Sequence, residues 1–154
     1  MSVYFIEEGH RYVHDSGIEL MSVTEFISTF FPKFEKDKWS KYVAKRDGLT
    51  QEEVLKMWKE KGDKAKEFGT LIHNYAEAII KEEERPEADS YKEKMYFKAV
   101  EKFIDKNDFF DAELVVGDPE LRVGGTIDGL SKKGEDIYLI DWKTNKEIKE
   151  DGYV

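Results

Sequence analysis

Beyond Asn107 the sequence changes from a helical to an extended pattern, and this change constrains the fold more than any other feature. Three apolar-rich segments follow, at residues 109–116, 121–130 and 136–142. They are separated by Gly117-Asp118-Pro119 and Ser131-Lys132-Lys133-Gly134, which are turn-forming sequences. Connections this short join antiparallel neighbours, because a parallel pair needs a crossover of about a dozen residues or more. We therefore expect a three-strand antiparallel meander.

The third segment is apolar on both faces before it ends in a charged triplet. Its residues 137–140 are Ile-Tyr-Leu-Ile, and successive side chains of a strand point to opposite faces. This pattern is typical of a central strand that is covered on each side. We expect the long helices to supply that cover.

The sequence before residue 107 predicts a β-hairpin followed by helices. Val3–Ile6 and Glu8–Val13 surround a glycine-containing turn, which is typical of two short paired strands. Ser22-Val23-Thr24-Glu25 and Thr50-Gln51-Glu52-Glu53 have the spacing of capping boxes, which mark helix starts. Helices are expected at residues 23–31, 35–46, 51–61, 63–84 and 91–105, with a break at Gly62. The chain thus divides into a hairpin and helical segment, residues 1–61, packed on a core at residues 62–154.

The composition limits the chemistry that the chain can perform. It contains no cysteine, which excludes disulfides, thiolate zinc sites, Cys-ligated iron–sulfur clusters and thiol nucleophiles. No apolar stretch approaches the ~20 residues that cross a bilayer, and the N-terminus lacks a signal-peptide pattern, so we expect no membrane association and a cytoplasmic, intracellular location. The formal charge of −9 argues against a protein that coats duplex DNA. A metal ion or a local lysine cluster can still supply positive charge.

Asp141-Trp142-Lys143 ends the third strand, thirteen residues after Asp128. Because side chains alternate along a strand, Asp141 and Lys143 share one face and Trp142 points to the other layer. If Asp128 lies on the neighbouring strand, two carboxylates meet, and they repel unless a cation lies between them. Oxygen ligands favour Mg²⁺ or Mn²⁺, and a nearby lysine can orient a water molecule or neutralise a scissile phosphate. The pattern indicates a metal site for cutting phosphodiester bonds.

Simpler interpretations exist for each of these residues. Asp141 and Lys143 alone are compatible with an exposed ion pair at a strand end, and Asp128 with a loop cap. Asp128 follows Gly124-Gly125-Thr126-Ile127, however, and glycines weaken a strand unless something must approach its backbone closely. A second acidic-x-Lys triplet, Glu147-Ile148-Lys149, is expected at the surface.

A helical segment supplies a third set of polar residues. Gly69, His73 and Glu77 recur every four residues and so share one helix face. Glycine inside a helix costs ~1 kcal/mol relative to alanine, which a close approach to a ligand or another backbone would explain. His73 can bind a metal through one imidazole nitrogen, with Glu77 one turn further along. The alternative for His73 is a packing role.

Four elements thus occur in order: Gly69–His73 on a helix, Glu113 in a strand, Gly125–Asp128 in the next strand and Asp141–Thr144 in the third. This order resembles the PD-(D/E)xK nuclease superfamily, in its RecB-like and phage-type exonuclease branch. The resemblance covers residues 63–145. More weakly, His10-Arg11-Tyr12 and Ser22-Val23-Thr24 resemble the entry segment of some phage-associated members.

The resemblance implies a restriction-endonuclease-like α/β core, in which helices flank a central mixed sheet. It also implies Mg²⁺- or Mn²⁺-dependent hydrolysis of DNA that leaves 5′-phosphates. The implied metal ligands are His73, Asp128, Asp141 and the backbone carbonyl of Trp142, and the implied catalytic residues are Asp128, Asp141 and Lys143, with Lys143 positioning the attacking water. Secondary candidates are Glu77, Glu113 and Thr144, whose hydroxyl would contact phosphate.

An exonuclease or a recombination and repair nuclease acting on DNA ends is the expected function. A non-catalytic nucleic-acid-binding or assembly module that keeps the nuclease fold is the alternative. Members of this branch that carry an iron–sulfur cluster are excluded by the lack of cysteine. In the family a further helix and strand follow, and no segment of this sequence matches them. We therefore expect either a fragment of a longer protein or a core completed by a partner chain or a second copy.

A cluster of aromatic residues precedes the second capping box, namely Phe30, Phe31, Phe34, Trp39 and Tyr42. The favoured interpretation is core packing between neighbouring helices. The alternative is stacking on the splayed bases of a single nucleic-acid strand.

Overall fold

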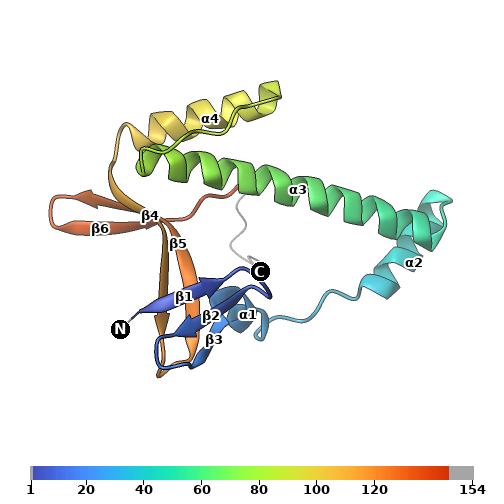
Figure 1. Ribbon diagram of the computed structural model, residues 1–154. Coiled ribbons are helices and arrows are strands. Elements are labelled where there is room, and N and C mark those ends of the chain that lie inside the picture. Colours follow the sequence, from blue (N-terminus) through green and yellow to red (C-terminus); the bar gives the residue numbers. More distant parts are fainter. Residues whose placement is uncertain (1, 146–154) are drawn as a thin grey trace.

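Six strands and four helices make up residues 2–145, the part of the chain that the structure, a computed structural model, describes (Figure 1). The strands are β1 (Val3–Ile6), β2 (Arg11–His14), β3 (Glu19–Ser22), β4 (Asp108–Asp118), β5 (Val123–Lys133) and β6 (Asp136–Ile140). The helices are α1 (Val23–Ser28), α2 (Lys36–Asp47), α3 (Gln51–Ile80) and α4 (Tyr91–Ile104). The Glu147-Ile148-Lys149 triplet lies outside the described residues. None of the described helices is long and apolar enough to cross a membrane.

Side-chain caps start three of the helices. Ser22 accepts a hydrogen bond from the Glu25 amide at the start of α1, and Thr50 and Glu53 form a reciprocal capping box at the start of α3. Both starts were expected from sequence. A third cap, in which Ser90 and Glu93 form a capping box at the start of α4, was not recognised in advance. These local bonds satisfy amide groups that have no partner inside the helix.

The helix break expected at Gly62 is wrong. Helix α3 runs without interruption for 30 residues and crosses the expected boundary between residues 61 and 62. No neighbouring atom lies within 4 Å of a Cβ built at Gly62, so no contact explains this glycine. A single glycine costs only ~1 kcal/mol in a helix, and the good helix formers on either side outweigh that cost.

The strands form one mixed sheet in the order β1-β2-β3-β5-β4, with β6 also paired to β5. The meander β4-β5-β6 is antiparallel, as expected from its short turns. Strand β3 joins the hairpin to this meander by pairing parallel to β5. Neither β3 nor this parallel pair was expected from the sequence pattern, and the parallel pair is what makes the sheet mixed.

One edge of β5 has a gap, meaning a stretch of residues that no described strand pairs with along that edge. Strand β4 pairs along nearly all of β5, so β3 and β6 share the opposite edge. On that edge β3 pairs at Val123 and Gly124, and β6 pairs from Gly129 onward. The stretch 125–128 between them is free of a strand partner there. This stretch contains Asp128, so the gap lies beside one of the expected metal ligands.

The main core lies between α3, α4 and the start of the meander. Its buried cluster contains side chains from both helices, with Phe109 and Trp142 packed against it. The members of the cluster are Ile72, Tyr75, Ala76, Phe97, Val100 and Ile104. The indole of Trp142 stacks on Phe109 with ring centroids 5.9 Å apart and meets Phe103 edge-on at 5.7 Å. The segment after β6 is therefore anchored to the helices through one side chain.

Two packing expectations are wrong. Strand β6 is not a covered central strand, because Ile137, Tyr138 and Leu139 are all exposed and the helices pack instead on β4 and β5. The aromatic residues between α1 and the end of α2 do not form a core either. Their exposed fractions reach 71% at Phe30 and 66% at Phe34. Apolar periodicity identifies these residues as apolar but does not show which neighbour covers them.

Candidate metal centre

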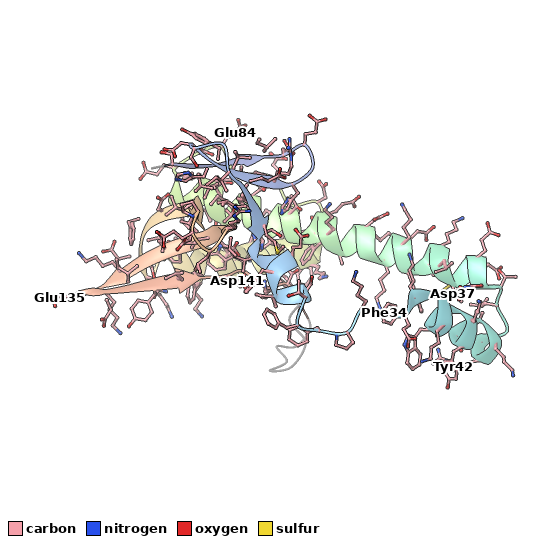
Figure 2. The ribbon with its side chains drawn as sticks, turned by 90° about the horizontal axis from the view of Figure 1, so that it is seen from below. Phe34, Asp37, Tyr42, Glu84, Glu135 and Asp141 are labelled. Atoms are coloured by element: carbon pink, nitrogen blue, oxygen red, sulfur yellow. The ribbon has the colours of Figure 1, made fainter. Side chains whose placement is uncertain are left out.

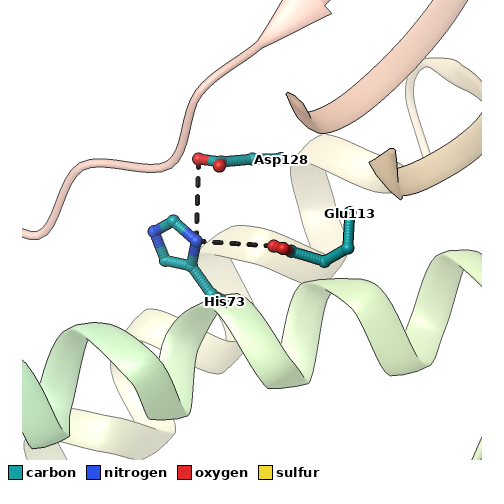
Figure 3. Close-up of side chains that lie close together, drawn as sticks. All are labelled: His73, Glu113 and Asp128. Carbon is teal, nitrogen blue, oxygen red and sulfur yellow. Dashed lines mark ion pairs between the residues drawn. The ribbon is translucent and has the colours of Figure 1, made fainter. Parts of the chain in front are cut away.

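Three elements bring three possible metal ligands to one point (Figure 3). His73 comes from α3, Glu113 from β4 and Asp128 from β5, and one ligand atom of each lies within 4.8 Å of the other two. Their side chains retain only 30%, 29% and 14% exposure. Among the described residues, this is the one such group of histidine and acidic side chains. One imidazole and two carboxylates form a suitable donor set for a divalent cation.

The two carboxylates face each other across neighbouring strands. Ala112 pairs with Gly129 and Leu114 pairs with Ile127, which places Glu113 opposite Asp128. Like charges directly opposite each other destabilise a sheet. Glu113 also has φ = 50°, in the left-handed region that a residue with a side chain rarely adopts. Charge repulsion and backbone strain at one position are typical of a functional site, and a cation between the carboxylates would relieve the repulsion.

The backbone of Trp142 holds two of the three ligands in place. Its N–H donates to Asp128 Oδ2 at 2.8 Å, and its carbonyl lies 2.9 Å from His73 Nε2. Since a carbonyl can only accept, the His73 proton sits on Nε2, and Nδ1 faces the carboxylates. Nδ1 lies 3.7 Å from Glu113 Oε1 and 3.6 Å from Asp128 Oδ2. A histidine that binds a metal through one nitrogen usually donates the other N–H in this way.

The expected ligand set is therefore brought together only in part. His73 and Asp128 meet as expected, and the Trp142 carbonyl adjoins them, although here it accepts the His73 hydrogen bond. Glu113, a secondary candidate, takes a full place in the cluster. Asp141 lies outside it and forms an ion pair with Lys143, with Nζ 2.9 Å from Oδ1.

Asp141 and Lys143 line a cavity of about 710 Å³ at the gap in the β5 edge. Its walls come from the N-terminal hairpin, α1, β5 and the segment after β6. Several hydroxyl and amide groups lie on them, from Tyr12, Ser22, Thr24, Thr126 and Asn145. Tyr12 and Thr126 were not expected at the site, and their hydroxyl oxygens lie 3.0 Å apart. This contact joins two residues 114 positions apart, so no local sequence pattern indicates it.

The two remaining candidates, Glu77 and Thr144, lie in different places: Glu77 is outside the cavity lining and Thr144 is beside α3. Glu77 forms an ion pair with Lys81 at 2.6 Å and lines a groove with residues 83–87, away from the cluster. Thr144 lies over α3, where a Cβ added at Gly69 would be 3.7 Å from its Oγ1. Gly69 thus faces the segment that carries Asp141 to Thr144, although a methyl group would also fit there.

The cluster changes the proton affinities of its own members. The nearby Glu113 carboxylate, helped by the charge of Asp128, raises the pKa of His73 against the opposing effect of burial. Burial raises the pKa of Asp128 above its usual value, and the charges of Asp141 and Glu113 add to this effect. Hydrogen bonding from the Trp142 amide and the positive charge of His73 oppose the rise at Asp128. Without a cation, the site therefore favours a protonated histidine beside its carboxylates.

Metal affinity is expected to rise with pH through the raised pKa of His73. A histidine with a raised pKa stabilises the metal-free fold below its ordinary pKa, and this contribution is lost as pH rises through the raised value. A metal competes for the same nitrogen lone pair, so Mn²⁺ affinity should increase about tenfold per pH unit while His73 is protonated. Calorimetric titration in buffers of different ionisation enthalpy measures the released proton. An affinity that is flat between about pH 6 and 8, with no proton release, would contradict the assignment of His73 as a ligand.

A scan against protein-family models finds no match, and no curated protein and no solved structure matches the chain. The resemblance to PD-(D/E)xK nucleases therefore rests on the residues themselves.

Proposed function

We propose that this chain is a metal-dependent DNA nuclease with a restriction-endonuclease-like core. The observation that carries the proposal is the cluster of His73, Glu113 and Asp128, with its two opposed carboxylates. Lys143 lines the adjoining cavity, and a lysine there would offset the charge that develops on a scissile phosphate. The order of these residues along the chain, helix histidine before strand carboxylates before Asp-x-Lys, supports the same function.

Each residue has a definite task under this proposal. His73, Glu113 and Asp128 would hold the divalent ion, which would act as a Lewis acid and lower the pKa of a bound water. Lys143 would position the attacking water and offset the charge that develops on the phosphate. Asp141 orients the Lys143 ammonium through their ion pair. The hydroxyl groups of the cavity would bind the nucleic-acid backbone.

The ligand set favours Mn²⁺ over Mg²⁺. Two carboxylates suit either ion, but imidazole is a softer donor than the oxygen ligands that Mg²⁺ prefers. We expect both ions to support cleavage, with Mn²⁺ effective at lower concentration.

Cleavage of a labelled oligonucleotide tests the proposal. The parent chain should cut DNA with Mn²⁺ and not with a chelator. Lys143→Met, which keeps the length of the side chain and removes its charge, should lower the rate about 100-fold or more. Lys133→Met is the matched control, since Lys133 ends β5 and is exposed. Cleavage that persists in chelator, or a Lys143→Met rate equal to that of the parent, would refute the proposal.

One observation favours a second candidate, a nucleic-acid-binding module without catalysis. Lys143 is paired with Asp141 and Asp141 is outside the metal cluster, so two of the three expected catalytic residues neutralise each other. Such a module would bind DNA equally well in chelator and would not cut it with Mn²⁺.

A further inference from the structure

The exposed aromatic residues between α1 and the end of α2 have no role in the fold that accounts for them. The five lie in one stretch of the chain, which we call the aromatic strip: Phe30, Phe31, Phe34, Trp39 and Tyr42. Each is at least 44% exposed, and Phe30 reaches 71%. Phe30 meets Phe26, and Phe34 meets Trp58, with ring centroids 5.3 and 5.8 Å apart. The rings of Trp39 and Tyr42 meet each other at 5.9 Å. Exposed apolar surface that is concentrated in one segment marks an interaction site.

The same segment is basic in an otherwise acidic chain. Residues 33–47 carry six lysine or arginine residues and three acidic residues, a net charge of +3, while the whole chain carries −9. The three acidic residues are already paired, Glu35 with Lys38, Asp37 with Lys41 and Asp47 with Arg46. Within the described part of the chain, no acidic group lies within 4.0 Å of the ammonium groups of Lys33, Lys36 and Lys45. Positive charge therefore accompanies the aromatic strip along its length.

The strip starts at the wall of the cavity. Helix α1 lines the cavity through Val23, Thr24 and Ile27, and the chain continues from its end into the aromatic residues. Figure 2 shows Asp141 beside α1, Phe34 in the connection to α2, and Tyr42 on α2 at the far end of α3. A ligand that leaves the cavity along this side would meet the aromatic residues in sequence order.

We infer that residues 30–45 form a stacking platform for single-stranded nucleic acid that leads into the cavity. This inference rests on the proposed nuclease function and names its substrate class. Aromatic rings stack on the open faces of unpaired bases, and interleaved lysines contact the phosphates between them. In a duplex the base faces are stacked on one another, so a duplex would make only the contacts between lysine and phosphate. A protein partner would not require a net charge of opposite sign to the rest of the chain.

The distance along α3 sets the length of strand that this platform needs. Phe34 contacts Trp58 with ring centroids 5.8 Å apart, and His73 lies fifteen residues further along the same helix. At ~1.5 Å per residue the separation is about 22 Å, which a stacked strand covers in about six or seven nucleotides at ~3.4 Å each. A strand shorter than this cannot extend from Phe34 to His73.

Fluorescence anisotropy with labelled oligothymidylate, in chelator, tests the platform without any contribution from the metal. A 15-mer should bind the parent chain at least tenfold more tightly than a 4-mer. Phe30→Ala combined with Tyr42→Ala should weaken 15-mer binding about tenfold or more, since each stacked base contributes roughly fivefold or more. Binding of the 4-mer should change less. Lys36→Gln combined with Lys45→Gln should flatten the salt dependence of 15-mer binding.

Tyr91→Ala is the matched control, because Tyr91 is a 79% exposed aromatic residue on α4, away from the strip. It should leave 15-mer binding unchanged. Circular dichroism verifies that each variant is folded. Equal 15-mer affinity in the parent chain and the double aromatic variant would overturn the inference. So would sedimentation showing that the aromatic substitutions disrupt self-association while nucleic-acid binding persists.

The outcomes separate this inference from the proposed function. Aromatic-dependent binding of the 15-mer without cleavage in Mn²⁺ would support the platform and refute the nuclease. Mn²⁺-dependent cleavage, together with a 15-mer affinity that the aromatic substitutions leave unchanged, would support the nuclease and refute the platform.

Discussion

Asp128→Asn is expected to weaken Mn²⁺ binding ~100-fold or more while making the metal-free protein more stable. Affinity falls because a charged ligand is lost, and even the hydrogen-bond partners of ligands are worth ~10–100-fold. The asparagine oxygen can still accept the hydrogen bond that the Trp142 amide donates to Asp128. The substitution therefore tests the charge of this residue and preserves its shape.

The gain in stability follows from the direction of the Asp128 pKa. Burial raises that pKa in the folded chain, so the charged carboxylate is disfavoured there relative to the unfolded chain. A raised carboxyl pKa means that stability is lost as pH rises from the unfolded value through the folded one. At neutral pH the neutral amide escapes this penalty and the repulsion from Glu113 opposite it. We expect the free energy of unfolding without metal to increase by about 1 kcal/mol.

Thermal unfolding with and without Mn²⁺ measures both effects. With Mn²⁺ at 100 times its dissociation constant, the parent should gain about 2.7 kcal/mol, or a Tm increase of roughly 5–10 °C. Without metal, Asp128→Asn should unfold at a higher temperature than the parent, and that Mn²⁺ concentration should raise its Tm by less than about 2 °C. Asp136→Asn, at the exposed start of β6, should behave as the parent does. A variant that is less stable than the parent without metal, or that keeps the Mn²⁺ response, would contradict a cation site at Asp128.

The parts of the fold that sequence predicts are those fixed by neighbours along the chain. Ser22 and Thr50 cap helices through hydrogen bonds that span three residues, so their spacing is visible in the sequence. The short turns between β4, β5 and β6 likewise specify an antiparallel meander. Gly62 does not end the helix, because the ~1 kcal/mol cost of one glycine is smaller than the contribution of the good helix formers in the thirty residues around it.

The parts that sequence does not predict depend on distant contacts. The parallel pairing of β3 with β5 joins Met21 to Val123, and no local pattern encodes it. The exposure of β6 and of the aromatic strip depends on where the helices pack, which apolar composition alone does not determine. The exposure of the strip matters for function, because the strip carries the proposed nucleic-acid platform.

The candidate site was predictable in part, because Asp141 lies outside the cluster and Glu113 takes a place in it. The helix histidine and the carboxylate after the glycines were identified by type and spacing, and they meet in the structure. The turn between β4 and β5 contains the signal for Glu113, because residues at equal distance from an antiparallel turn face each other, and Glu113 and Asp128 are such a pair. Its left-handed backbone, with φ = 50°, is visible only in the structure.

Trp142→Ala is expected to lower both the free energy of unfolding and the affinity for Mn²⁺. The half-buried indole packs on Phe109 and Phe103, and the same residue's backbone bonds to Asp128 and His73. Loss of the ring should lower the free energy of unfolding by about 2–4 kcal/mol, since large-to-small changes of aromatic residues cost ~3–5 kcal/mol at full burial. The segment that carries both backbone bonds would then lose its anchor. Mn²⁺ affinity should fall about 10–100-fold, as for other groups that orient metal ligands.

Two matched variants separate anchoring from a general loss of packing. Trp142→Phe keeps a ring on Phe109 and removes an indole N–H that is buried without a hydrogen-bond partner among the described residues. It should remain within about 1 kcal/mol of the parent and keep its Mn²⁺ affinity. Trp39→Ala removes an indole that is 44% exposed on α2 and should change the free energy of unfolding by less than about 1 kcal/mol. Urea unfolding and calorimetric Mn²⁺ titration, done where circular dichroism shows folded protein, measure both quantities. If Trp142→Ala kept full Mn²⁺ affinity, the backbone of residue 142 would not be what holds His73 and Asp128 in place.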